Sequence, residues 1–433
     1  MARWRGDGLA ARLLRGGTSS LLATVAEVLL GLLLLVLLAR SLGPDGLGIY
    51  AFVLAVTSLI AVPARMGLPE LVVRQTARGQ AFGDWGHVLG LWRWAHGLIL
   101  GISLLVALVL GMILLADLVA VESIRKPLLW GLLLVPSLAL LSIKSAALRG
   151  LGNVLSGILI DVVLRPALLV LLVMAVVTLP AISLTPELVI KLTVMSALVA
   201  YAIGVAWLYR VRPSGIVDAK SQYDSRSWIA AAWPMALSQG FQQINRHTDL
   251  LLIGILVSSS DVGVYRVAAQ GALLVSLGLT ALNMLVAPFI TDLHARGEFE
   301  KLQKIARRTA QASLAFAVPA VLGFVIFGEK LLVTIFGEAF SAAWLPLLIL
   351  GLGQIANAGF GSVGLLLNMT GYERDVTRMV AVAAVLNVLL NLTLIPTFGV
   401  NGAAAATSIS LVLWNVLLWR LVRRRLGIRC SAI

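Results

Sequence analysis

Long apolar runs, separated by short polar connections, make up most of this 433-residue sequence. A helix needs about 20 apolar residues to cross the hydrocarbon core of a bilayer, and it satisfies its own backbone hydrogen bonds there. The pattern predicts an all-α polytopic membrane protein with about twelve transmembrane helices, at Thr18–Arg40, Leu47–Met66, Leu91–Ala116, Pro127–Ala147, Asn153–Leu179, Glu187–Tyr209, Trp228–Val257, Val262–Ile290, Thr309–Phe327, Ala342–Met369, Val376–Pro396 and Gly402–Leu421.

The seventh run looks like the start of a second copy of the first half. Residues 263–265, Gly-Val-Tyr, repeat Gly-Ile-Tyr at 48–50, and the two are 263 − 48 = 215 positions apart. The most polar connection, Val211–Ser227, lies between the two sets of six runs. An even number of spans gives both copies the same orientation. We therefore predict an N-terminal six-helix lobe at 1–210, a linker at 211–227 and a C-terminal six-helix lobe at 228–433.

Composition and charge support this class and give the chain an orientation. Hydrophobic residues make up 60% of the chain and charged residues 12%, which excludes an ordinary soluble protein. Arginine and lysine concentrate on every second connection and in the C-terminal tail, so the positive-inside rule places both termini and the 211–227 linker in the cytoplasm. The same rule explains the net charge of +14 without nucleic acid.

Four polar side chains share one face of the seventh run. Gln239, Gln242, Arg246 and Asp249 are spaced by three, four and three residues. Polar groups at membrane depth usually face a bundle interior or a water-filled cavity. An Arg246–Asp249 ion pair that only holds helices together is the simple alternative, but the two glutamines favour a polar lumen.

Other charged residues lie within or at the edges of the runs. Asp161 and Arg165 are four apart with the acid first, which is the favourable order for a helical ion pair. Glu27 falls opposite Gln242 in the repeat register, and a buried acid either pairs with an arginine or titrates. Arginine can bind two phosphate oxygens at once, so arginines in a lumen suit an anionic substrate.

We accordingly assign the candidate residues to two roles. Substrate binding is predicted for Arg246, Arg165, Arg65, Gln239, Gln242 and Arg266. Gating or ion coupling is predicted for Glu27, Asp249 and Asp161. The sequence has no Walker lysine, no H-E-x-x-H and no C-x-x-C, and its one cysteine is Cys430. We therefore predict no enzyme activity, no cofactor and no metal site.

Several segments resemble one family of transporters. Ala39–Tyr50, with the sequence ARSLGPDGLGIY, is similar to the Wzx-type polysaccharide flippases of the multidrug/oligosaccharidyl-lipid/polysaccharide (MOP) exporter superfamily. Further similar segments, ALRGLGN at 147–153, FGEAF at 336–340 and IPTFGVNGAA at 395–404, follow in the family's order. Twelve spans also fit this branch better than the fourteen of the lipid II flippase branch.

This resemblance implies two six-helix lobes around a central cationic cavity. It also implies alternating access that moves an undecaprenyl-diphosphate-linked oligosaccharide across the bacterial cytoplasmic membrane, for surface polysaccharide such as exopolysaccharide or O-antigen. Membrane lipids, a polysaccharide polymerase and other export components are the implied partners.

Other functions remain open at this stage. An ion-coupled drug or small-molecule exporter of the same superfamily could use Glu27, Asp161 and Asp249 as coupling carboxylates, although the cationic excess disfavours large cationic drugs. A membrane glycan polymerase or ligase would normally have a large outer loop, and every outer connection here is short. A major facilitator transporter is disfavoured because Pro69–Gly79 lacks that family's Gly-x-x-x-Asp-Arg loop.

Overall fold

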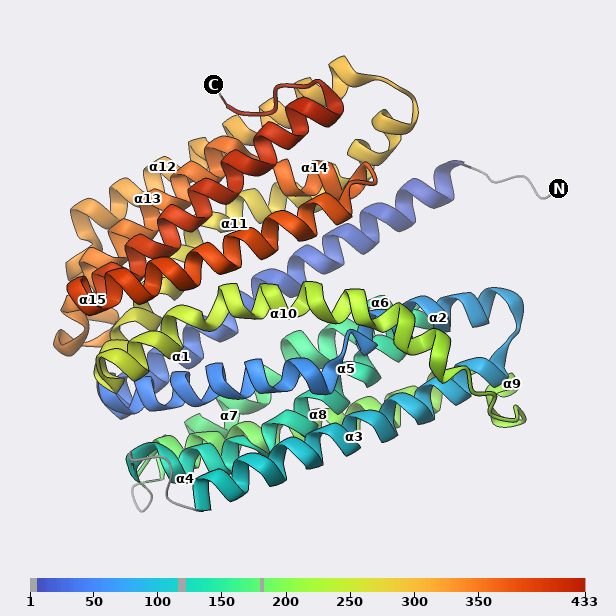
Figure 1. Cartoon of the computed structure of the whole chain (residues 1–433), viewed down its shortest axis with the longest axis horizontal. Coiled ribbons are helices and arrows are strands. Elements are labelled where there is room, and N and C mark those ends of the chain that lie inside the picture. The colour runs from blue at the N-terminus through green and yellow to red at the C-terminus, as the bar shows by residue number, and fades with distance from the viewer. Residues whose placement is uncertain (1–5, 116–121, 180–182, 433) are drawn as a thin grey trace. The chain divides into compact units, whose positions relative to one another are not determined.

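The computed structural model describes residues 6–115, 122–179 and 183–432, and this part of the chain contains helices and turns without strands. The elements (Figure 1) are α1 Gly6–Arg65, α2 Leu68–Phe82, α3 Trp85–Leu115, α4 Glu122–Gly131, α5 Leu134–Gly150, α6 Val154–Ile158, the π-helix η1 Leu159–Leu164, α7 Arg165–Thr178, α8 Pro186–Val211, α9 Ser214–Val217, α10 Ser225–Leu256, α11 Ser259–Ala295, α12 Phe299–Phe336, the 3₁₀-helix η2 Glu338–Ala343, α13 Trp344–Phe360, α14 Val363–Met369 and α15 Glu373–Leu426.

The helices confirm a polytopic membrane protein. Nine segments of the described chain are long and apolar enough to cross a membrane. Two of these, α1 and α15, contain a sharp break and so provide two spans each. Helix α10 has 32 residues, which is long enough to span a membrane, but its polar residues make it less apolar than these nine segments, and it is not among them. Counting both halves of α1 and α15, together with α10, gives the twelve predicted spans.

Glycines make the two breaks possible. Gly43 has φ 67° and Gly399 has φ 56°, in the left-handed region that residues with a Cβ atom rarely adopt. Pro44 follows Gly43 and disfavours a helical conformation at the residue before it. The segment that resembles the polysaccharide flippases therefore forms the connection between the first two spans.

Contacts divide the chain into two compact units. Unit 1 comprises Met1–Ser41 and Val53–Gln243, and unit 2 comprises Leu42–Phe52 and Ile244–Ile433. The boundary thus runs through α10, and the segment that follows the first break belongs to unit 2. The predicted six-helix lobes with a linker at 211–227 stay a prediction.

Within unit 2 the two copies of the repeated motif pack against each other reciprocally. A Cβ atom at Gly48 would lie 1.7 Å from the carbonyl oxygen of Ser259, and one at Gly263 would lie 2.0 Å from that of Pro44. The 215-residue offset maps Pro44 onto Ser259 and Gly48 onto Gly263, so both contacts are the same contact seen from each copy. Ser259 also donates a hydrogen bond to Asp45. This symmetry supports the repeat that the sequence predicts.

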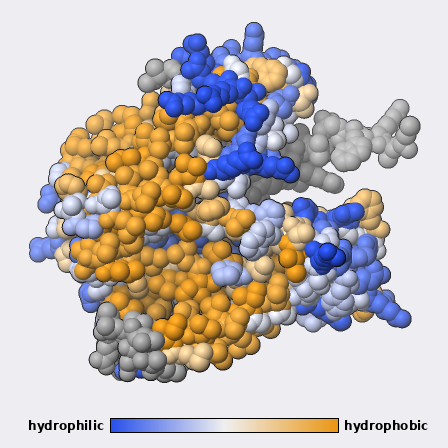
Figure 2. All heavy atoms as spheres, in the orientation of Figure 1, coloured by the Kyte–Doolittle hydropathy of each residue, from blue (hydrophilic) through white to orange (hydrophobic). Residues whose placement is uncertain are grey.

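The surface of both units is largely apolar. Side chains such as Leu104, Ile326 and Leu352 are more than half exposed, and the visible face in Figure 2 is mostly hydrophobic. A soluble protein rarely exposes so much contiguous apolar surface. Lipid is the solvent that suits this surface.

Candidate functional site

A buried carboxylate lies at the centre of a polar cluster in unit 2. Asp249, on α10, is 5% exposed. Its Oδ2 atom accepts hydrogen bonds from the hydroxyl of Tyr265 on α11 at 2.6 Å and from that of Thr407 on α15 at 2.5 Å. Its Oδ1 atom accepts one from Nδ2 of Asn391 on α15 at 2.8 Å. No arginine or lysine among the described residues is ion-paired with it, so three neutral donors hold the carboxylate.

The break in α15 brings two of these donors to the same depth. Asn391 lies eight residues before Gly399 and Thr407 eight residues after it. At 1.5 Å per residue, both are about 12 Å from the break along their own arm. Asn387, one turn from Asn391, accepts a further hydrogen bond from Asn391 Nδ2 at 3.2 Å. The turn at Gly399 thus folds α15 into a hairpin whose arms share one acid.

The cluster provides oxygen ligands without a metal-binding motif. No group of three or more His, Cys, Asp or Glu side chains able to hold a metal ion occurs in the described residues. Carboxylate, hydroxyl and amide oxygens instead suit a proton or a hard cation. The Oδ1 atom of Asn391 is buried and has no hydrogen-bond partner, so it is available to such a cation.

Sequence reasoning identified Asp249 but missed its partners. Tyr265 belongs to the repeated Gly-Val-Tyr motif, and Asn387 and Asn391 are four apart in an apolar run. Amides inside a transmembrane run are costly unless they are bonded. That signal could have placed Asn387 and Asn391 among the candidates.

The four residues of the predicted polar face of α10 differ in their burial. Asp249 points into unit 2, Gln239 is half-buried, and Gln242 and Arg246 are exposed. No ion pair joins Arg246 to Asp249 in the described part of the chain, so the simple helix-locking pair does not form. Arg246 therefore remains available to a ligand.

Arginines with unsatisfied hydrogen-bonding groups lie in unit 1. The predicted Asp161–Arg165 pair is present, with Arg165 Nε 3.8 Å from Asp161 Oδ1. Arg65, the last residue of α1, lies in electrostatic range of Asp161, Arg165 and Glu70. The Nε atoms of Arg65, Arg149 and Arg165 are buried and lack hydrogen-bond partners. Among the described residues, every arginine Nε atom that is buried without a hydrogen-bond partner lies in unit 1.

The local fold explains these positions. Asp161 lies in the π-helix η1, where the wider turn adds a residue before Arg165 and Pro166 begin α7. Arg149 is in the last turn of α5. Its side chain lies against Gly157, where a Cβ atom would be 2.7 Å from Arg149 Cγ.

The remaining candidates are Glu27 and Arg266. Glu27 is exposed on the first half of α1 in unit 1, and it takes part in an interaction there. Arg266 follows Tyr265 on α11 and is half-buried, in electrostatic range of Tyr50. Their predicted roles, like those of Gln239 and Gln242, stay predictions.

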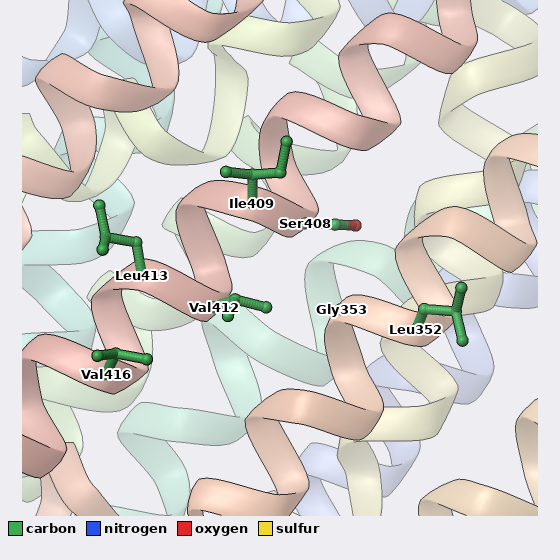
Figure 3. A pocket seen from close by; sticks show the side chains of 7 residues that line it. All are labelled: Leu352, Gly353, Ser408, Ile409, Val412, Leu413 and Val416. Carbon is green, nitrogen blue, oxygen red and sulfur yellow. The ribbon is translucent and has the colours of Figure 1, made fainter.

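An apolar groove runs along unit 2 between α13 and the second half of α15. Figure 3 shows its lining, which consists of Leu352, Gly353, Ser408, Ile409, Val412, Leu413 and Val416. Its polar side chain, Ser408, donates a hydrogen bond to the carbonyl oxygen of Ile349 at 2.8 Å. The groove thus suits hydrocarbon and offers nothing to a charged group.

Comparison with known proteins supports the class that the helices and buried polar groups define. Residues 13–294 match the family described as "Polysaccharide biosynthesis protein", and residues 234–393 match the MatE family. The chain belongs to the polysaccharide biosynthesis protein family, within the MOP superfamily, as the sequence resemblance suggested.

Individual relatives are more distant. The chain is 27% identical over 169 residues to the probable low-salt glycan biosynthesis flippase Agl15 of Haloferax volcanii, covering 39% of this chain and 36% of the relative. It is 28% identical over 219 residues to the probable flippase AglR of the same organism, covering 50% and 45%. These matches span less than half the length of either relative.

A solved structure shares the fold. The lipid II flippase MurJ, in an inward closed conformation, superimposes with a TM-score of 0.75 and 14% identity, over 93% of this chain and 87% of that one. At this identity the comparison establishes the fold alone.

Proposed function

We propose that this chain is a flippase that moves lipid-linked oligosaccharide repeat units across the cytoplasmic membrane by alternating access. The observation that carries the proposal is the set of buried, unbonded Nε atoms of Arg65, Arg149 and Arg165 in unit 1. Buried polar groups in proteins are nearly always hydrogen-bonded, so these atoms call for an acceptor. A diphosphate supplies oxygen acceptors and the negative charge that arginine binds.

Family membership makes a polyprenyl-diphosphate carrier the natural source of that diphosphate. We propose an undecaprenyl-diphosphate-linked glycan as the substrate, with Gln239, Gln242, Arg246 and Arg266 as further contacts. A polysaccharide polymerase is the proposed downstream partner. The chain acts in this proposal as a transporter and not as an enzyme.

We further propose that Asp249 binds the coupling ion. Three neutral donors stabilise its charged form, and no fixed cation competes for it in the described chain. Both termini are proposed to be cytoplasmic, because Arg423, Arg424 and Arg425 end α15. Glu27 and Asp161 are the proposed gating carboxylates.

An exporter of small molecules is the second candidate, favoured by the match of residues 234–393 to the MatE family. It would use the same coupling carboxylate. The two functions differ in the charge of the substrate, because the arginines of unit 1 whose Nε atoms lack hydrogen-bond partners favour an anionic substrate over a cationic drug.

Transport by purified protein in proteoliposomes tests the proposal. The substrate is a polyprenyl-diphosphate-linked oligosaccharide, and an externally added glycosidase measures the fraction that reaches the outer leaflet. Arg165→Ala should weaken substrate binding about 10- to 100-fold, since a hydrogen bond to a charged group contributes roughly 1.5–3 kcal/mol. Arg165→Lys should recover part of the loss, because lysine retains the charge but not the planar fork.

Arg226→Ala is the matched control, because Arg226 is exposed at the start of α10. Equal transport by Arg165→Ala and Arg226→Ala would contradict the diphosphate role. Export of a cationic dye, with no glycan movement, would favour the second candidate.

A further inference from the structure

Unit 2 contains buried polar residues along both arms of α15, and they are unevenly distributed. The buried polar residues of this helix are Asn387, Asn391, Ser410 and Asn415. All lie eight or more residues from Gly399, so they occupy the half of the hairpin away from the break. Fewer than eight residues from the break, the buried residues are Ile395, Gly402, Ala403, Ala404 and Ala406. The buried polar side chains of α15 are therefore confined to one side of the hairpin, from the level of Asp249 toward the helix ends, while the buried residues nearer the break are all apolar or small.

Amides occur at regular intervals of depth on the polar side. Measured from Gly399 at 1.5 Å per residue, Asn391 lies about 12 Å away, Asn387 about 18 Å and Asn415 about 24 Å. These three amides are 0%, 3% and 4% exposed. They extend from the level of Asp249 toward the ends of α15, across most of the remaining half of a bilayer core about 30 Å thick.

Neighbouring helices contribute further polar side chains near the level of Asn415. Asn415 donates a hydrogen bond to Asn357 Oδ1 on α13 at 3.0 Å, and Asn357 donates to Gln354 Oε1 at 3.2 Å. Ser362, at the break after α13, donates to Asn283 of α11. Uncharged polar side chains from three helices thus lie between Asp249 and the end of the unit where α15 begins and ends.

Helix packing alone does not account for these residues. Amides do hold transmembrane helices together, and the Asn415–Asn357 bond fits that role. Yet Asn391 Oδ1 and Ser410 Oγ are buried without a hydrogen-bond partner. Polar atoms used only for packing are normally satisfied, so these two call for a further ligand such as water or a cation.

We propose that these amides form the route by which a small hydrated cation passes between Asp249 and the cytoplasmic side of unit 2. This proposal rests on the proposed coupling role of Asp249 and on the proposed orientation. Amide oxygens replace part of a cation's hydration and reduce the cost of moving charge through a medium of low dielectric constant. They carry no net charge, so they do not trap the ion. The apolar residues near Gly399 close the opposite side.

Sodium is the probe for the test. Equilibrium binding of ²²Na⁺ to purified protein gives the affinity, and ²²Na⁺ exchange in proteoliposomes gives the rate at which the cytoplasmic side is reached. Asn415→Leu should slow exchange at least tenfold while the equilibrium affinity stays within about twofold, because Asp249 and its donors are unchanged. Asn401→Leu is the matched control, since Asn401 lies two residues past Gly399 on the opposite side of Asp249, and it should leave both quantities unchanged.

A second variant keeps the test sound if the single change destabilises the fold. Asn415→Leu leaves the Asn357 amide without its donor, which is costly, whereas Asn357→Leu/Asn415→Leu removes both partners. The double variant should show the same slow exchange. Unchanged exchange in a folded double variant would overturn the route while the coupling role of Asp249 stands.

The coupling role fails differently. Binding of ²²Na⁺ that is equal in the wild type and in Asp249→Asn, together with equal proton uptake by a pH-sensitive dye, would exclude Asp249 as the ion site and the route with it. If Asp249 binds protons and not sodium, the same variants should slow the proton signal at least tenfold, and an unchanged proton signal would overturn the route.

Discussion

The reciprocal contact of the two repeats can be tested by adding one methyl group. In Gly48→Ala, the new Cβ atom would lie 1.7 Å from the carbonyl oxygen of Ser259, well under the 3.0 Å that such atoms keep. The two segments must therefore separate by 3.0 − 1.7 = 1.3 Å or more at this point. Overpacking of this kind costs about 1–3 kcal/mol. Alanine offsets part of that cost, because it stabilises a helix by roughly 0.5–1 kcal/mol relative to glycine.

The net expectation for Gly48→Ala is a loss of about 1–2 kcal/mol in the free energy of unfolding. Gly101→Ala in α3 is the matched control, since nothing lies within 4 Å of a Cβ atom there. That control should be neutral or slightly stabilising. The free energy of unfolding can be measured for both variants with denaturant in detergent micelles.

The double variant Gly48→Ala/Gly263→Ala provides a sharper test. Its two new methyl groups enter the same crossing, so the separation that the first requires also relieves the second. The combined loss should be smaller than the sum of the two single losses, as expected for residues in contact. If Gly48→Ala is as stable as Gly101→Ala, or if the two losses simply add, the reciprocal contact is not the one described.

Three further predictions concern the hydroxyl groups around Asp249, the reactivity of Cys430 and the orientation of the chain. Tyr265→Phe removes one of the three donors to Asp249 and should weaken ²²Na⁺ binding or shift it to higher pH, whereas Tyr223→Phe, at an exposed tyrosine, should change neither. The wild-type chain should resist an impermeant maleimide at pH 7, because Cys430 is buried and burial raises the pKa of its thiol to about 11. Since the thiolate is the reactive form, labelling of Cys430 should grow only as the pH rises toward that value. In this silent background, Tyr223→Cys should be labelled in inside-out vesicles, and its labelling in intact cells would refute the cytoplasmic linker.

Much of the fold could be predicted from the sequence because membrane helices follow one simple rule. A run of apolar residues long enough to cross lipid has no alternative to a helix, so both the span count and the class were predictable. The sequence also indicated where the two repeats are equivalent, since Gly48 and Gly263 occupy corresponding positions in them. The unit boundary inside α10 was not predictable, because it depends on which helices touch and not on local polarity.

The site was predicted less completely, for a physical reason. A charge in an apolar run is conspicuous, so Asp249, Arg165 and Arg65 were identified. The hydrogen-bond partners of Asp249 are neutral. A hydroxyl or amide side chain, such as that of Thr407 or Asn391, can bond to the backbone of its own helix, so neither residue is conspicuous in the sequence. Spacing on α10 also suggested that Arg246 and Asp249 act together. The structure separates them, because the side chains of α11 and α15 surround only Asp249.

The membership of Leu42–Phe52 in unit 2 has a consequence for synthesis of the chain. Gly48 and its contact Ser259 are 259 − 48 = 211 residues apart, so the segment leaves the ribosome long before its partner exists. At about 5–20 residues per second, the wait is roughly 10–40 s. During that time the segment around Gly48 lacks its native neighbour, and the insertion machinery or another helix must cover it. Final packing of the first half of the protein therefore depends on synthesis of the second half.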